Sequence, residues 1–165
     1  MAKVSVIIPN YRHAPYLQER IDSVLAQTWR DFEIIILDDC SPDNSREVIE
    51  RYRGNERITH IVYNEQNSGS TFVQWQKGFD LSQGEYIWIA ESDDFAEPGF
   101  LAACVEQLDQ DPACTLAYTE SRLVDAESRP MKKRMKKAYS RGRECDIWDG
   151  EEFVVANMLR CNTIY

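Results

Sequence analysis

The sequence predicts an α/β fold in which helices flank a mostly parallel β-sheet. Short apolar runs alternate along the chain with segments of helical periodicity. This alternation is typical of β-α-β units with right-handed crossovers. Polar or acidic residues follow several of the apolar runs. Because ligands of such sheets bind outside the carboxyl ends of the strands, these residues are the first candidates for a site.

The first part of the chain predicts three strands and two helices. Runs rich in β-branched and apolar residues predict strands at 4–8, 32–37 and 58–63. Apolar residues at helical spacing predict a helix at 15–25. Turn and cap residues at 41–45 indicate the start of a second helix at 46–52.

The second part continues the alternation and then loses it. We expect helices at 71–81 and 98–108, with Pro98 in the first turn of the latter, and strands at 86–90 and 115–118. Beyond Glu120, residues 129–143 are basic and almost free of apolar side chains, which predicts a loop. Residues 148–159 predict one more helix.

Composition limits the classes of function. The chain has 165 residues, 43% of them hydrophobic, and a formal net charge of −9, so it is long enough for one sizeable core. The acidic balance argues against nucleic acid as a partner, but a divalent cation would still allow a small phosphorylated ligand. Five scattered cysteines and two histidines argue against a zinc cluster and fit a reduced, cytoplasmic protein. We expect neither a signal peptide nor a membrane span.

The strongest candidate site is the acidic turn Glu91-Ser92-Asp93-Asp94. Its carboxylates repel one another, and Mg²⁺ and Mn²⁺ commonly bridge such oxygen ligands to substrate phosphates. Taken alone, a turn like this is more often a solvated turn or a helix cap. Asp38-Asp39 ends the second strand in the same way, and two acidic strand ends on one sheet edge favour a site.

Three further segments carry alternatives. Tyr11 offers a ring for stacking, although packing against the following helix explains it equally well. The loop 67–71 either presents backbone N–H groups to a phosphate or simply begins a helix. The basic run 132–137 is either a solvated loop or a contact with an anionic membrane surface.

Together, five segments resemble the family 2 glycosyltransferases: VSVIIPNY at 4–11, IDSVLAQT at 21–28, FEIIILDDCS at 32–41, NSG at 67–69 and GEYIWIAESDD at 84–94. The resemblance implies the Rossmann-like GT-A fold and inverting transfer from a nucleoside-diphosphate sugar of the UDP or dTDP type. It also implies Mn²⁺ or Mg²⁺ as cofactor and a saccharide or lipid-linked saccharide as acceptor. Cell-surface polysaccharide synthesis at the inner face of the membrane would follow.

The resemblance also assigns roles to the nucleotide-binding residues. Tyr11 is similar to the aromatic residue that stacks on the base, and Pro9 to the edge of the base pocket. Asp39 is similar to the carboxylate that reads a uracil-type imide, with Asp38 beside it.

At the acidic turn, Asp94 resembles the main metal ligand and Asp93 the acid on the ribose or metal side. Glu91 stands where many members have Asp. The family's Arg-Asn pair before the glycine of the third helix is replaced by Trp75-Gln76, which makes Lys77 the candidate for a phosphate contact.

The resemblance implies that the catalytic base lies in a C-terminal acceptor half. No matching position occurs before Tyr165, so we expect a chain truncated at its C-terminus: a nucleotide-sugar-binding core at 1–120 and the start of the acceptor part at 121–165. If the base is here after all, Glu120, Asp125 and Asp146 are the carboxylates to consider.

Three other classes of protein share this arrangement of strands and helices. A receiver-type phosphoacceptor domain would need its acid pair after the first strand, where Pro9-Asn10 stands, and a dinucleotide-binding oxidoreductase would need G-x-G-x-x-G there. A nucleotide-sugar-binding module without turnover remains the alternative.

Overall fold

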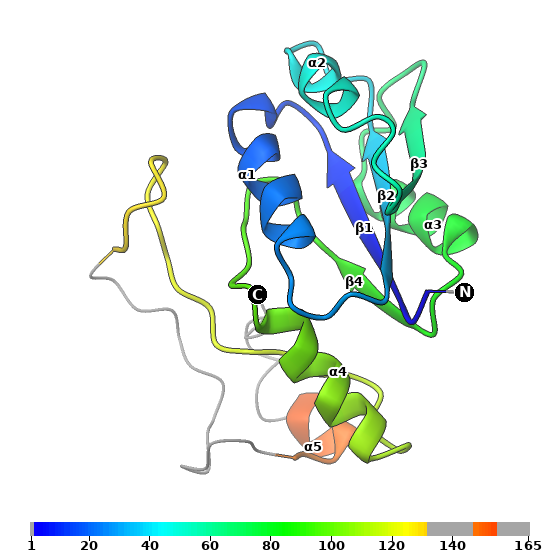
Figure 1. Cartoon of the computed structure of the whole chain (residues 1–165), viewed down its shortest axis with the longest axis vertical. Coiled ribbons are helices and arrows are strands. Elements are labelled where there is room, and N and C mark those ends of the chain that lie inside the picture. The colour runs from blue at the N-terminus through cyan, green and yellow to red at the C-terminus, as the bar shows by residue number, and fades with distance from the viewer. Residues whose placement is uncertain (1, 132–146, 155–165) are drawn as a thin grey trace. The chain divides into compact units, whose positions relative to one another are not determined.

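The computed structural model describes residues 2–131 and 147–154. Four strands form its sheet: β1 (Val4–Asn10), β2 (Phe32–Asp38), β3 (Ile58–Tyr63) and β4 (Tyr86–Ile89). Their order is β3-β2-β1-β4, and each neighbouring pair is parallel (Figure 1). The structure therefore confirms the predicted α/β fold and the first four predicted strands.

The two central strands are buried along their whole length. All seven residues of β1 and all seven of β2 are buried, which explains why the sequence reads as apolar runs without alternation. The register pairs Val4 with Phe32 at one end and Asn10 with Asp38 at the other. The polar residues Asn10 and Asp38 thus lie side by side at the carboxyl edge of the sheet.

Helices cover both faces of this sheet (Figure 1). On one face, α1 (Ala14–Leu25) and α2 (Ser45–Glu50) pack with alternate strand residues such as Val6 and Ile34. On the other face, α3 (Thr71–Leu81) packs beside Ile7 and Ile35. The residues of β1 therefore point alternately into two separate apolar layers.

Gly78 allows α3 to lie unusually close to β1. A Cβ atom at this position would be 2.5 Å from Cγ2 of Ile7, a side chain with no solvent exposure. No carbon atom fits at that separation, so a residue larger than glycine would displace the helix or the strand. The closeness matters for the site because the preceding turn of α3 carries Gln74 and Trp75.

The chain divides into two compact units, residues 1–106 and 107–165. The predicted functional boundary at residue 120 stays a prediction. Helix α4 (Phe100–Gln110) begins two residues later than predicted. Pro98 instead lies in the preceding turn, where its carbonyl accepts a hydrogen bond from the backbone N–H of Thr28.

The predicted fifth strand at 115–118 is wrong. These residues have no regular secondary structure, and Leu116 is 55% exposed, whereas a parallel strand needs cover on both faces. A short helix, α5 (Gly150–Phe153), begins after its cap Asp149. The rest of the predicted helix 148–159 and the basic run 132–137 lie outside the described residues. Within the described ranges, no helix is long and apolar enough to cross a bilayer.

Candidate functional site

A cleft of about 370 Å³ opens at the carboxyl ends of β1, β2 and β4. The residues that line it are Pro9, Asn10, Tyr11, His13, Asp39, Asn67, Gly69, Ser70, Thr71, Gln74, Glu91 and Ser92. The structure thus brings Pro9, Tyr11 and Asp39 together, as the sequence predicts. Tyr11 is 41% exposed, so its ring is available to a ligand.

Asp38 braces the loops that follow β1 and β2. Its carboxylate accepts hydrogen bonds from Asn10 Nδ2 (2.7 Å) and from the backbone N–H of Ser41 (3.1 Å). The hydroxyl of Ser41 accepts the backbone N–H of Arg12. Arg12 and Cys40 both have positive φ, near 60°, a strained conformation for residues other than glycine. Asp38 is not among the cleft-lining residues; its contacts instead hold the loops that border the cleft.

Asp39 organises one wall of the cleft. It is buried, and its carboxylate oxygens accept hydrogen bonds from five donor groups on the loop after β3 and on α3. These donors are Asn64 Nδ2, Asn67 Nδ2, the backbone N–H and hydroxyl of Ser68, and Gln74 Nε2. A carboxylate has about four acceptor positions, so Asp39 is saturated by the protein itself. Recognition of a base imide by Asp39 stays a prediction and would require one of these donors to move.

Lys77 belongs to the same network rather than to the cleft surface. Its Nζ donates to Asn64 Oδ1 at 2.7 Å, and Asn64 in turn donates to Asp39. Lys77 is not among the cleft-lining residues, so a phosphate contact from Lys77 stays a prediction. The structure shows it supporting the loop around Asp39.

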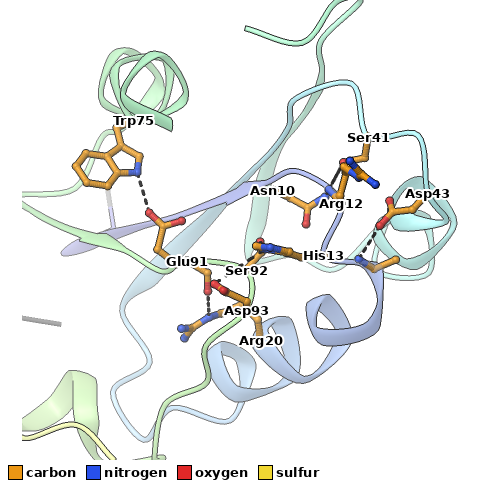
Figure 2. Close-up of polar contacts among 11 residues, drawn as sticks. Asn10, Arg12, His13, Arg20, Ser41, Asp43, Trp75, Glu91, Ser92 and Asp93 are labelled. Carbon is orange, nitrogen blue, oxygen red and sulfur yellow. Dashed lines mark hydrogen bonds and ion pairs between the residues drawn. The ribbon is translucent and has the colours of Figure 1, made fainter. Parts of the chain in front are cut away.

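The acidic turn after β4 is held from three sides, as Figure 2 shows. Trp75 Nε1 on α3 donates to Glu91 Oε1 at 3.0 Å. Nδ1 of His13 lies 2.8 Å from the hydroxyl of Ser92 and 4.0 Å from Asp93 Oδ1. Arg20 Nε on α1 donates to the backbone carbonyl of Glu91 at 2.7 Å. The two departures from the family pattern, Trp75 and Glu91, are therefore partners.

Arg20 contacts the acidic turn, and sequence reasoning missed it. Its side chain is buried and lies 5.6 Å from the ring centroid of Trp88. Burial lowers the pKa of Arg20 to about 10, against the opposing effect of Asp94, Asp93 and Glu91. A signal was present in the sequence: position 20 falls on the same helical face as the apolar Leu17, Ile21 and Val24.

The acidic turn carries more negative charge than Arg20 compensates. Burial raises the pKa of Glu91, and the charges of Asp93 and Asp94 add to this increase against the hydrogen bond from Trp75. Desolvation also raises the pKa of Asp94; Arg20 opposes the shift and Asp93 adds to it. Asp93 and Asp94 are both exposed, so an added cation can reach them.

The donor atoms of this turn suit a hard divalent cation. They are carboxylate oxygens and one hydroxyl, the ligand type that Mg²⁺ and Mn²⁺ prefer. No group of three His, Cys, Asp or Glu side chains is gathered for a metal among residues 2–131 and 147–154. The turn therefore fits an ion held by one or two carboxylates, with the remaining ligands supplied by phosphate oxygens and water.

Gln74 and His13 also lie in the cleft without having been predicted there. Gln74 is one of several polar residues on α3, so nothing in the sequence distinguishes it, yet it is 3% exposed and donates to Asp39. Its Oε1 is buried with no hydrogen-bond partner among the described residues, as is Oδ1 of Asn10.

Comparison with known proteins gives a consistent result. The family model for glycosyl transferase family 2 matches residues 5–161. An uncharacterized glycosyltransferase of Nostoc, alr2836, is 42% identical over 106 residues, which are 63% of this chain and 32% of the relative. The poly(ribitol-phosphate) β-N-acetylglucosaminyltransferase TarP of Staphylococcus aureus is 40% identical over 98 residues, 57% of this chain and 29% of TarP.

Solved structures agree with the sequence matches. TarS 1–349 of S. aureus in complex with UDP-GlcNAc aligns with a TM-score of 0.60 and 28% identity, over 66% of this chain and 31% of the 1–349 chain. The mannosyltransferase PcManGT of Pyrobaculum calidifontis, solved with GDP-Man and Mn²⁺, aligns with a TM-score of 0.60 over 74% of this chain and 36% of PcManGT; at 22% identity it supports the fold alone.

The chain spans only about a third to a half of the length of these curated relatives. It covers 51% of TuaG of Bacillus subtilis, whose assignment to teichuronic acid biosynthesis is provisional, and 32% of alr2836. The match nevertheless extends over nearly all of this chain, and the sheet, its flanking helices and the edge cleft accord with it. The chain therefore belongs to glycosyl transferase family 2 and has the GT-A fold.

Proposed function

We propose that this chain is the donor-binding part of an inverting glycosyltransferase that takes a sugar from a UDP- or dTDP-type donor. The acceptor is the hydroxyl of a saccharide or lipid-linked saccharide in cell-surface polysaccharide synthesis. One observation carries the proposal: a single cleft joins an exposed aromatic ring, Tyr11, to the acidic turn that begins at Glu91. TarS bound to UDP-GlcNAc and the polymer-synthesis names of TarP and TuaG support the choice of donor and pathway class.

In this proposal the nucleoside occupies the end of the cleft near Tyr11. The ring of Tyr11 stacks on the base, and Pro9 borders it. Asp39 keeps the wall in place through its bonds to the loop 64–68 and to Gln74. The diphosphate then extends toward Ser92 and the acidic turn.

A diphosphate cannot lie next to these carboxylates without a positive charge between them. Asp93 and Asp94 would hold Mn²⁺ or Mg²⁺, which would supply neutralisation of the departing diphosphate. Lys77, whose Nζ donates to Asn64 Oδ1, remains the candidate for a further contact with the phosphates.

Transfer also needs a base that takes the proton of the acceptor hydroxyl. Asp125 is a poor candidate, because hydrogen bonds from Arg129 and from the backbone N–H of Glu127 lower its pKa. Asp146 lies outside the described residues. We propose that the base belongs to the acceptor-binding part and is not among the described residues, so that this chain alone binds a donor without transferring its sugar efficiently. We also propose that the protein acts at the inner face of the membrane.

The test is a calorimetric and thermal-shift screen of UDP, dTDP, GDP and ADP, with and without Mn²⁺. We expect UDP and dTDP to bind and to raise the melting temperature, chiefly when Mn²⁺ is present. Asp94→Ala should abolish the Mn²⁺-dependent part of nucleotide binding. Asp80→Ala should not, because Asp80 is an acid on α3 that pairs with Gln76 away from the cleft. Equal binding of all four nucleotides, or an Asp94→Ala variant with unchanged affinity, would refute the proposal.

A further inference from the structure

A buried positive charge on α1, that of Arg20, lies against the acidic turn. Arg20 is 3% exposed, and its Nε donates to the Glu91 carbonyl at 2.7 Å (Figure 2). Nη1 of the same guanidinium is buried and has no partner among the described residues. Burying a guanidinium with an unused donor is unfavourable, so its position requires compensation.

That compensation comes from the surrounding charges and one ring. The carboxylates that attract Arg20 are, in order of effect, Asp94, Asp93 and Glu91. The face of Trp88 provides a further favourable contact with the cation. Since the charges that act on Arg20 include those of both proposed metal ligands, Arg20 and a bound cation would act on the same carboxylates.

We propose that Arg20 is the resident counter-charge of the acidic turn: it stabilises the turn while no cation is bound, and it weakens the binding of a free divalent cation there. This inference rests on the proposed function for the identity of the cation site. Arg20 acts through Asp93 and Asp94 and does not touch the ligand, so it is a positioning residue.

The sign of the effect separates this role from simple structural support. If Arg20 only held the Glu91 carbonyl, its removal would loosen the turn and weaken cation binding. If its charge competes with the cation, its removal leaves three carboxylates uncompensated and tightens cation binding. A unit charge near a divalent ion in a partly buried site alters affinity on the order of tenfold.

The experiment titrates Mn²⁺ into the protein without nucleotide and follows free Mn²⁺ by electron paramagnetic resonance. Arg20→Met removes the charge and keeps much of the packing on Trp88, Arg20→Gln removes the charge and keeps a donor, and Arg20→Lys keeps the charge. Arg46→Met is the matched control, since Arg46 also lies over a ring, that of Tyr63, but on α2. Circular dichroism checks the fold of each variant.

We expect about tenfold tighter Mn²⁺ binding in Arg20→Met and Arg20→Gln, and wild-type binding in Arg20→Lys and Arg46→Met. Adding Asp94→Asn to Arg20→Met should remove the gain, which locates the ion at the turn. Unchanged or weaker Mn²⁺ binding in a folded neutral variant would overturn the inference. If only the Lys variant folds, the need for charge is supported; if none of the three folds, the charge account is overturned in favour of a guanidinium-specific structural role.

Nucleotide plays no part in this titration. A wild-type chain that binds no UDP would refute the proposed function and leave the comparison of the Arg20 variants standing.

Discussion

Replacing Asp39 with Asn should be the most damaging single-atom change in the cleft. Each oxygen of Asp39 faces three donor contacts: Oδ1 faces Asn64 Nδ2, Ser68 N–H and Gln74 Nε2, and Oδ2 faces Asn67 Nδ2 and the N–H and hydroxyl of Ser68. Whichever way an Asn side chain turns, its NH₂ group meets donors. Hydrogen bonds to a charged group contribute about 1.5–3 kcal/mol each, so after relaxation we expect a loss of about 2–4 kcal/mol in unfolding free energy.

Asp38→Asn is the matched comparison, because Asp38 is equally buried and adjacent but accepts only from Asn10 Nδ2 and the Ser41 N–H in the described contacts. An Asn there can keep the shorter bond, and we expect a loss of about 1–2 kcal/mol. Urea unfolding, followed by tryptophan fluorescence, measures both. In calorimetry with Mn²⁺, Asp39→Asn should weaken UDP binding about tenfold, because the loop 64–68 forms a wall of the cleft. Equal stability losses in the two variants, or unchanged UDP affinity in Asp39→Asn, would refute this account.

Three further variants test other parts of the molecule. Tyr11→Ala should lose a base-stacking contact and weaken UDP binding roughly 5- to 100-fold, whereas Tyr11→Phe should keep the stacking contact. Equal UDP affinities of Tyr11→Ala and the wild type, measured by calorimetry, would exclude stacking. Gly78→Ala should lower the unfolding free energy by about 1–3 kcal/mol through its clash with Ile7. Gly99→Ala, whose added Cβ meets no atom within 4 Å, should not lower it. Thermal unfolding of the two variants measures the difference. Glu33→Gln should destabilise the protein at pH 7 and progressively less below about pH 4. Burial alone would raise the pKa of Glu33, but hydrogen bonds from Ser5, the Gln83 N–H and Thr59 lower it. The stabilisation from the Glu33 carboxylate is therefore present above the pKa of the unfolded state and is lost as the pH falls through the pKa of the folded state. A stability difference that does not change with pH would contradict that assignment.

The buried strands were predictable because each leaves a local signature. A strand covered on both faces is apolar along most of its length, and the runs at 4–8 and 32–37 have that composition apart from Ser5 and Glu33. Acidic residues follow the strands at 32–37 and 86–90, so their gathering at one edge also follows from parallel topology. The strand at 115–118 failed because a short apolar run carries no information about whether a partner strand is available.

The partners within the site could not be predicted in the same way. Nothing local indicates that Gln74 will reach Asp39, 35 positions earlier, or that Arg20 will meet the Glu91 carbonyl. Such contacts depend on the packing of helices against the sheet, which fixes distances to within an ångström. Sequence reasoning found the charged groups of the cleft and missed the groups that hold them.

Helix α3 connects the two ends of the cleft. Successive residues on it, Gln74 and Trp75, donate to Asp39 at the nucleoside end and to Glu91 at the acidic turn. Both bonds depend on how closely the helix approaches β1, and Gly78, one turn further along, permits that approach. A displacement of α3 would therefore alter both ends at once, because the helix moves as a rigid element. If this coupling holds, Gly78→Ala should weaken Mn²⁺-independent and Mn²⁺-dependent UDP binding together, whereas Asp94→Ala removes only the second.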